Sequence, residues 1–111
     1  MQQHIALTES TFYVLMALYE KDTFGTEIVE YISNVTNCRV PMGPGTLYTI
    51  LAKFEKDKFI KEIGVEGRKR TYSITPYGRK VYEQEIERLE ELIKNARKAK
   101  GRFGKDRGEI S

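Results

Sequence analysis

Cysteine and histidine are almost absent from this chain of 111 residues, which has one of each, Cys38 and His4. A single cysteine cannot form an internal disulfide, so the sequence excludes a secreted scaffold held together by disulfides. One cysteine and one histidine also exclude a Cys/His zinc site. We therefore expect no metal and no cofactor.

Long apolar runs are missing too. The longest, Phe12–Tyr19, has eight residues, which is too short to cross a bilayer, and the N-terminus lacks the basic flank of a signal peptide. We expect a soluble, cytoplasmic protein that does not bind membranes. Because the chain has no Ser/His/Asp grouping, paired carboxylates or phosphate-cradling glycine loop, an enzyme is the least expected class.

The charge that is present is distributed unevenly. Apolar residues make up 40% of the chain, enough for the core of one domain, and the net charge is only +3. Residues 1–38 hold one lysine and five acidic residues, whereas residues 39–70 hold eight basic and four acidic residues. The middle third is therefore the part of the chain that we expect to face a polyanion.

Apolar spacing and capping residues predict four helices and one hairpin. The helices are expected over about residues 9–21, 25–35, 44–57 and 76–100, and the strands over 59–63 and 71–74. A turn is predicted at Lys21–Gly25, and the tip of the hairpin at Gly64–Arg70. The last eleven residues, with three glycines and little apolar content, are predicted to be disordered.

Three short helices followed by a hairpin are the element order of a winged helix-turn-helix. The predicted fold class is mainly α with a two-stranded β-wing and a long C-terminal helix. We expect residues 1–75 to form a DNA-binding domain, residues 76–100 a dimerisation helix and residues 101–111 a disordered tail.

The third predicted helix is the candidate recognition helix. Its outward face is small at the centre, with Gly45 and Thr49, so its backbone can approach the floor of a major groove about 12 Å wide. Its N-terminus directs positive dipole toward phosphate. Tyr48 can donate a hydrogen bond, and Lys53 and Lys56 can neutralise phosphates. The candidate DNA-binding residues of this helix are Gly43, Gly45, Thr46, Tyr48, Thr49, Lys53 and Lys56.

The hairpin tip adds a second candidate contact with DNA, through Arg68, Lys69 and Arg70. A lysine-bearing helix face or a basic tip is, taken alone, often merely solvated. Both features in this element order favour DNA binding. The alternative is a winged helix that serves as a protein-interaction module, with the basic tip docked on an acidic partner.

The last predicted helix carries a heptad seam, since its apolar residues are spaced +4, +3, +4, +3. An exposed apolar stripe on one domain would be adhesive. We expect the start of the helix to pack on its own body and the rest to form a homodimer. Two recognition helices would then contact an inverted repeat with half-sites about 34–36 Å apart. The seam residues are Tyr82, Ile86, Leu89, Ile93 and Ala96.

These motifs resemble a known family. The string Gly43–Tyr48 resembles the recognition-helix signature of the PadR family of transcriptional regulators, and Gly67–Tyr72 with Gly78 resembles its wing and wing-to-helix junction. The resemblance covers about residues 5–100. Lys58 stands where the family often has glycine, and a left-handed conformation there would cost about 1 kcal/mol. Further matching positions are Leu51, Phe54, Glu55, Asp57, Ile60, Ile74 and Thr75.

The resemblance is to the smaller PadR subgroup, which forms homodimers through a single C-terminal helix and commonly represses transcription. It implies a repressor relieved by a small aromatic or xenobiotic effector bound between the dimer helices. Some similar regulators hold flat drugs against a tryptophan of that helix. This chain has no tryptophan, and Leu89 stands at the comparable position, so a planar multidrug pocket is less supported.

Overall fold

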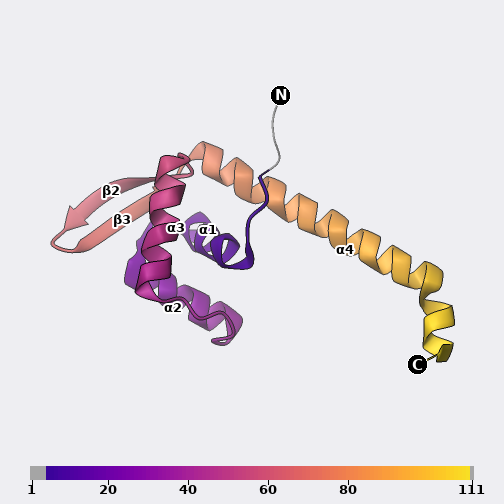
Figure 1. The fold of residues 1–111 in the computed structure, drawn as a ribbon. Helices are drawn as coiled ribbons and strands as arrows, with labels where there is room; N and C mark the ends of the chain where they lie inside the picture. Colours follow the sequence, from indigo (N-terminus) through magenta and orange to yellow (C-terminus); the bar gives the residue numbers. More distant parts are fainter. Residues whose placement is uncertain (1–4, 111) are drawn as a thin grey trace.

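The computed structural model describes residues 5–110, with side chains over residues 5–99. Figure 1 shows the first helices of the chain gathered in one body, a hairpin on one side of it and a long last helix leading away. The hairpin of the last two strands is called the wing below. In chain order the elements are α1 (Glu9–Glu20), β1 (Thr23–Phe24), α2 (Gly25–Thr36), α3 (Pro44–Lys56), β2 (Ile60–Glu66), β3 (Lys69–Ile74) and α4 (Pro76–Ile110).

All four helices begin at the residues that the sequence predicts, and three of these starts show the expected capping or proline signal. The Thr8 hydroxyl accepts a hydrogen bond from the Thr11 N–H at 3.2 Å and caps α1. The Thr75 hydroxyl accepts one from the Gly78 N–H at 2.9 Å and caps α4. α3 starts at Pro44, whose missing N–H leaves no donor unsatisfied in the first turn.

The end of α3 is a Schellman motif with Lys58 in the left-handed conformation. The Lys58 N–H donates to the Glu55 carbonyl at 3.1 Å, and the Phe59 N–H donates to the Phe54 carbonyl at 2.9 Å. The φ of Lys58 is 65°, in the region that favours glycine. The rings of Phe54 and Phe59 lie 5.5 Å apart and supply the apolar contact of the motif. The left-handed Lys58 considered from the sequence is therefore confirmed.

The sheet has three strands in the order β1-β3-β2, not the two predicted for the wing alone. Thr23 pairs with Tyr72 and Phe24 with Thr71, inside the segment predicted as a turn. A two-residue strand has no periodicity of its own. Its pairing with β3 creates it, so the sequence around Phe24 gave no signal for it.

The wing strands extend further toward the tip than predicted. Glu66 pairs with Lys69, which leaves only Gly67 and Arg68 in the turn. Gly67 has a φ of 62°, which a two-residue turn between antiparallel strands requires. The predicted tip at residues 64–70 is therefore mostly strand. The prediction missed this because both faces of the distal wing are exposed, and the glycines at 64 and 67 favour a turn.

The core lies between the first three helices and the base of the wing. Phe54 and Phe59 join α3 to the wing within it. Its buried apolar residues are Val14, Leu15, Ala17, Leu18, Ile28, Ile32, Val40, Met42, Leu47, Ile50, Leu51, Phe54, Phe59, Ile60, Tyr72, Ile74, Val81 and Tyr82.

α4 is packed on the body only at its start. The Tyr82 ring stacks on Phe12 at 5.1 Å and lies 4.6 Å from Tyr19, so Tyr82 is buried within its own chain. Val81 is buried beside it. Every described residue from 90 to 99 is exposed. The predicted contact of Val81 and Tyr82 with their own body is therefore confirmed.

α4 continues to Ile110, beyond its predicted end at residue 100. Residues 101–110, predicted as a disordered tail, are helical. The prediction weighted the cost of three glycines, about 1 kcal/mol each in a helix. A helix that has already formed adds one hydrogen bond for each residue fixed, and the charged residues between the glycines are compatible with it. Within the described part of the chain, no helix is both long and apolar enough to pass through a bilayer.

Candidate nucleic-acid interface

The exposed face of α3 holds all seven of its predicted DNA-binding residues. The helix buries Leu47, Ile50, Leu51 and Phe54 against the core, which turns the opposite side to solvent. Tyr48 is 63% exposed, the largest exposed fraction among the bulky apolar and aromatic side chains of the described chain. The remaining exposed members are Gly43, Gly45, Thr46, Thr49, Lys53 and Lys56.

Apart from Tyr48, the N-terminal half of this face carries only small residues, and the fold does not require glycine at positions 43 and 45. A Cβ placed on Gly43 or on Gly45 would meet no atom within 4 Å. The Thr49 hydroxyl donates to the Gly45 carbonyl at 3.0 Å, which leaves its oxygen able to accept. A partner can therefore approach the α3 backbone closely.

The C-terminal half of the face is cationic. Lys53 forms an ion pair with Asp57, Nζ to Oδ2 at 3.2 Å, and both side chains are exposed. Such a surface pair contributes little, so Lys53 can exchange Asp57 for another anion. Among the described residues Lys56 forms no ion pair.

The three cations of the wing lie in different surroundings, although they are consecutive in the sequence. Lys69 lies over the Phe24 ring, Nζ to centroid at 4.3 Å. Arg70 forms an ion pair with Glu62 at 3.3 Å, and Arg68 lies in the turn. Because successive residues of a strand point to opposite faces, Lys69 and Arg70 face opposite sides of the wing.

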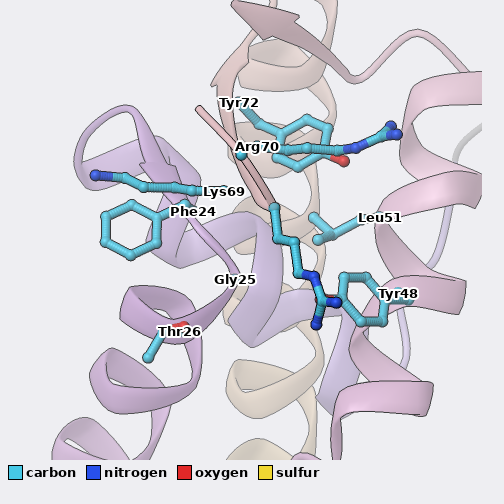
Figure 2. A pocket seen from close by; sticks show the side chains of 10 residues that line it. Phe24, Gly25, Thr26, Tyr48, Leu51, Lys69, Arg70 and Tyr72 are labelled. Carbon is cyan, nitrogen blue, oxygen red and sulfur yellow. The ribbon is translucent and has the colours of Figure 1, made fainter. Parts of the chain in front are cut away.

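A groove of about 780 Å³ runs between α3, the wing and the start of α2. Figure 2 shows Tyr48 and Leu51 on its α3 side and Phe24 and Lys69 on the opposite side. The groove joins two sets of residues that the sequence suggested separately, Tyr48 of α3 and the wing cations. Its lining residues are Phe24, Gly25, Thr26, Tyr48, Leu51, Gly67, Arg68, Lys69, Arg70 and Tyr72.

The groove presents donors and positive charge. The first two residues of α2, Gly25 and Thr26, line the groove, so the positive end of the helix dipole lies beside it. Burial raises the pKa of Tyr72, and the Glu55 carboxylate raises it further. Tyr72 therefore stays a neutral hydroxyl. The arrangement suits a polyanion of extended shape.

The DNA-binding residues predicted from the sequence do not include Phe24, Thr26 or Tyr72, which line the groove, or Glu62, which binds Arg70 at its edge. Phe24 and Thr26 reach the groove because β1 pairs with β3, and that pairing has no sequence signal. Strand alternation could have separated Lys69 from Arg70, had the strand been predicted to begin before residue 71.

The predicted seam on α4 is split by exposure. Tyr82, predicted as part of the dimer seam, is instead buried against its own body. Ile86 and Leu89 are half-buried, and Ile93 and Ala96 are exposed. Leu92, which the seam pattern omitted, is 51% exposed, as is Ile93. The exposed part of α4 thus carries apolar side chains that the chain itself does not cover. In the described part of the chain no three His, Cys, Asp or Glu residues gather to hold a metal ion.

The model of the transcriptional regulator PadR-like family matches residues 14–84. The chain belongs to this family. The match spans α1 to the first turns of α4, and so includes both the exposed face of α3 and the groove. PadR-family proteins are DNA-binding transcription regulators rather than enzymes, which makes DNA the expected polyanion for this surface.

Solved structures share the fold. A transcriptional regulator from Clostridium thermocellum is 37% identical, over 79% of this chain and 89% of that chain, with a TM-score of 0.70. A PadR-like transcription factor from Bacteroides fragilis is 17% identical, over 81% and 88%, with a TM-score of 0.70. A PadR-family regulator from Clostridium difficile R20291 is 19% identical, over 84% and 95%, with a TM-score of 0.66. A comparison with curated protein sequences finds no significant match.

Proposed function

We propose that this PadR-family protein is a homodimeric, sequence-specific repressor that inserts α3 into the major groove of DNA. The observation that carries the proposal is the exposed, small-centred face of α3 beside a cationic groove of about 780 Å³. One helix fits a major groove about 12 Å wide. The flanking phosphate strand would then lie in the groove between α3 and the wing.

Each part of the surface has a distinct task in this proposal. Tyr48 and Thr49 supply hydroxyls for base edges or phosphates. Lys53 and Lys56 neutralise the strand beyond the C-terminal half of α3. Arg68, at the tip of the wing, reaches the neighbouring strand or minor groove.

The proposed dimer forms through the exposed part of α4. Ile93, 51% exposed, supports this, because an uncovered apolar side chain on a projecting helix favours association. Ile86, Leu89 and Ala96 continue the seam. A two-fold axis through α4 would pair the two α3 helices on an inverted-repeat operator, with half-sites about 34–36 Å apart.

We also propose that a small aromatic or xenobiotic effector releases the operator by binding between the two α4 helices. Support for this part comes from the family resemblance. Isothermal titration against a panel of phenols and aromatic drugs tests it. Binding that lowers DNA affinity is expected, and no response across a broad panel would leave a constitutive repressor.

The central experiment is a titration of the DNA that flanks the protein's own gene against a random duplex of equal length. We expect a saturable preference for the flanking DNA. Tyr48→Ala should cost roughly 1–3 kcal/mol of that preference if the side chain contacts a base. Tyr48→Phe is the matched variant that removes only the hydroxyl. Equal binding to both duplexes at physiological salt would contradict the proposal.

The salt dependence tests the cationic half of α3 separately. Lys53→Ala should weaken binding to both duplexes and reduce the slope of log affinity against log salt by about 1. Lys80→Ala is the control, since Lys80 is an exposed lysine on α4, outside the groove. Equal salt slopes for the two variants would show that Lys53 does not contact DNA phosphate.

A further inference from the structure

One cation of the groove is already held by an acid of the wing. Arg70 lines the groove, and its NH1 donates to the Glu62 carboxylate at 3.3 Å. The Arg70 side chain is 61% exposed and that of Glu62 is 28% exposed. The contact is therefore a single, solvent-accessible hydrogen bond, which costs little to exchange.

The register of the wing explains why these two residues meet. Glu62 pairs with Tyr72 across the β2–β3 ladder, and paired residues share a face. Arg70 lies two residues before Tyr72 on β3, and so shares that face as well. Tyr72 is buried and lines the groove. Glu62 itself is not among the lining residues, so the ion pair ties a groove cation to an acid at the groove's edge.

We propose that Glu62 is a specificity-determining residue, which competes with DNA phosphate for Arg70 and so weakens binding to arbitrary duplexes. The inference rests on the proposed function. A phosphate that enters the groove must compete with the Glu62 carboxylate for the Arg70 guanidinium. Non-specific binding consists almost entirely of phosphate contacts. Competition by Glu62 therefore removes a larger share of its affinity than of the affinity for an operator. Operator binding adds contacts of α3 with base edges, which do not depend on Arg70.

The chain offers a matched control on the same strand. Glu66 pairs with Lys69 in the register of the wing, and Lys69 faces away from Arg70. Glu66→Gln removes the same charge as Glu62→Gln, at a position that makes no ion pair with Arg70.

The experiment measures fluorescence anisotropy of a labelled random-sequence duplex at about 50 mM and about 200 mM salt. Glu62→Gln should tighten binding and steepen the salt slope by about 0.9, the effect of one added phosphate contact. Its gain in affinity should then be about threefold larger at the lower salt. Glu66→Gln should leave the slope unchanged, and Glu62→Gln should have no effect in an Arg70→Gln background.

Three results would overturn the inference. Equal effects of Glu62→Gln and Glu66→Gln, or an effect that persists without Arg70, would mean that Glu62 acts only through bulk charge. Weaker binding by Glu62→Gln would mean that Glu62 orients Arg70 toward DNA. A failure of the proposed function looks different, because the unmodified chain would then bind the flanking duplex and the random duplex equally, or bind neither.

Discussion

At the scale of single residues, Gly45 lets the requirements of folding stability be tested apart from those of DNA binding. A Cβ on Gly45 would enter open space, and alanine is the better helix former. Gly45→Ala should leave the free energy of unfolding unchanged or raise it by up to about 1 kcal/mol. The added methyl stands on the face proposed to enter the major groove, so DNA affinity should fall. Urea unfolding and a DNA titration of the same preparation check this, and unchanged DNA affinity would argue against close approach at Gly45.

Lys58 gives the opposite kind of test, in which stability alone changes. Its φ of 65° suits glycine, and Lys58→Gly should raise the free energy of unfolding by about 1 kcal/mol. Lys58→Ala is the control, because it removes the side chain but keeps the Cβ that causes the strain. The midpoints of urea unfolding compare the two. A gain from alanine as large as that from glycine would place the cost in the lysine side chain.

The residues of the candidate site were only partly predictable. The exposed set on α3 followed from its apolar stripe, because a helix with one buried side must expose the other. The distinct surroundings of Lys69 and Arg70 depend on Phe24 and Glu62, which reach them through the three-stranded sheet. Such contacts arise from strand register, which a single sequence does not specify for exposed strands.

At the scale of elements, Gly78 holds the wing against α4. A Cβ there would lie 2.1 Å from the Phe59 carbonyl oxygen and 2.9 Å from Cγ1 of Ile74. The Thr75 hydroxyl also donates to the Lys58 carbonyl at 2.7 Å. The junction between β3 and α4 is therefore closely packed and has no room for a side chain at Gly78.

Gly78→Ala should force this junction apart and lower the free energy of unfolding by about 1–3 kcal/mol. Thermal unfolding monitored by circular dichroism measures the loss. Gly45→Ala is the matched control, because Gly45 also lies inside a helix and a Cβ at that position meets nothing within 4 Å. Equal stability of the two variants would show that the junction can relax.

The elements themselves differed in how far the sequence predicted them. The helices α1, α2 and α3 end within a residue of the expected bounds, because both apolar spacing and capping residues mark them. β1 was missed because only its partner strand makes it a strand. The far end of α4 was missed because glycine propensity was weighed against helix propagation and overvalued.

At the scale of the whole molecule, the proposed dimer depends on the part of α4 that leaves the body. Ile93→Glu places a charge on the seam without touching the core, since Ile93 is 51% exposed. The variant should remain folded, lose the dimer and lose affinity for an inverted repeat. Asn95→Glu introduces the same charge at an exposed residue off the seam. It should keep both the dimer and the affinity for the inverted repeat. Light scattering coupled to size-exclusion chromatography measures the molar mass of each variant in solution. A monomeric mass for the unmodified chain would contradict the proposed dimer.

α4 is continuous from the buried Val81 and Tyr82 to its exposed turns, and this has a mechanical consequence. Because α4 is anchored in the body at one end only, it acts as a rigid lever. A partner that binds the exposed part of α4 would therefore move α3 and the wing together as one rigid unit. In the proposed dimer, a small change in the angle at which the two α4 helices cross would therefore be amplified into a larger displacement between the two α3 helices.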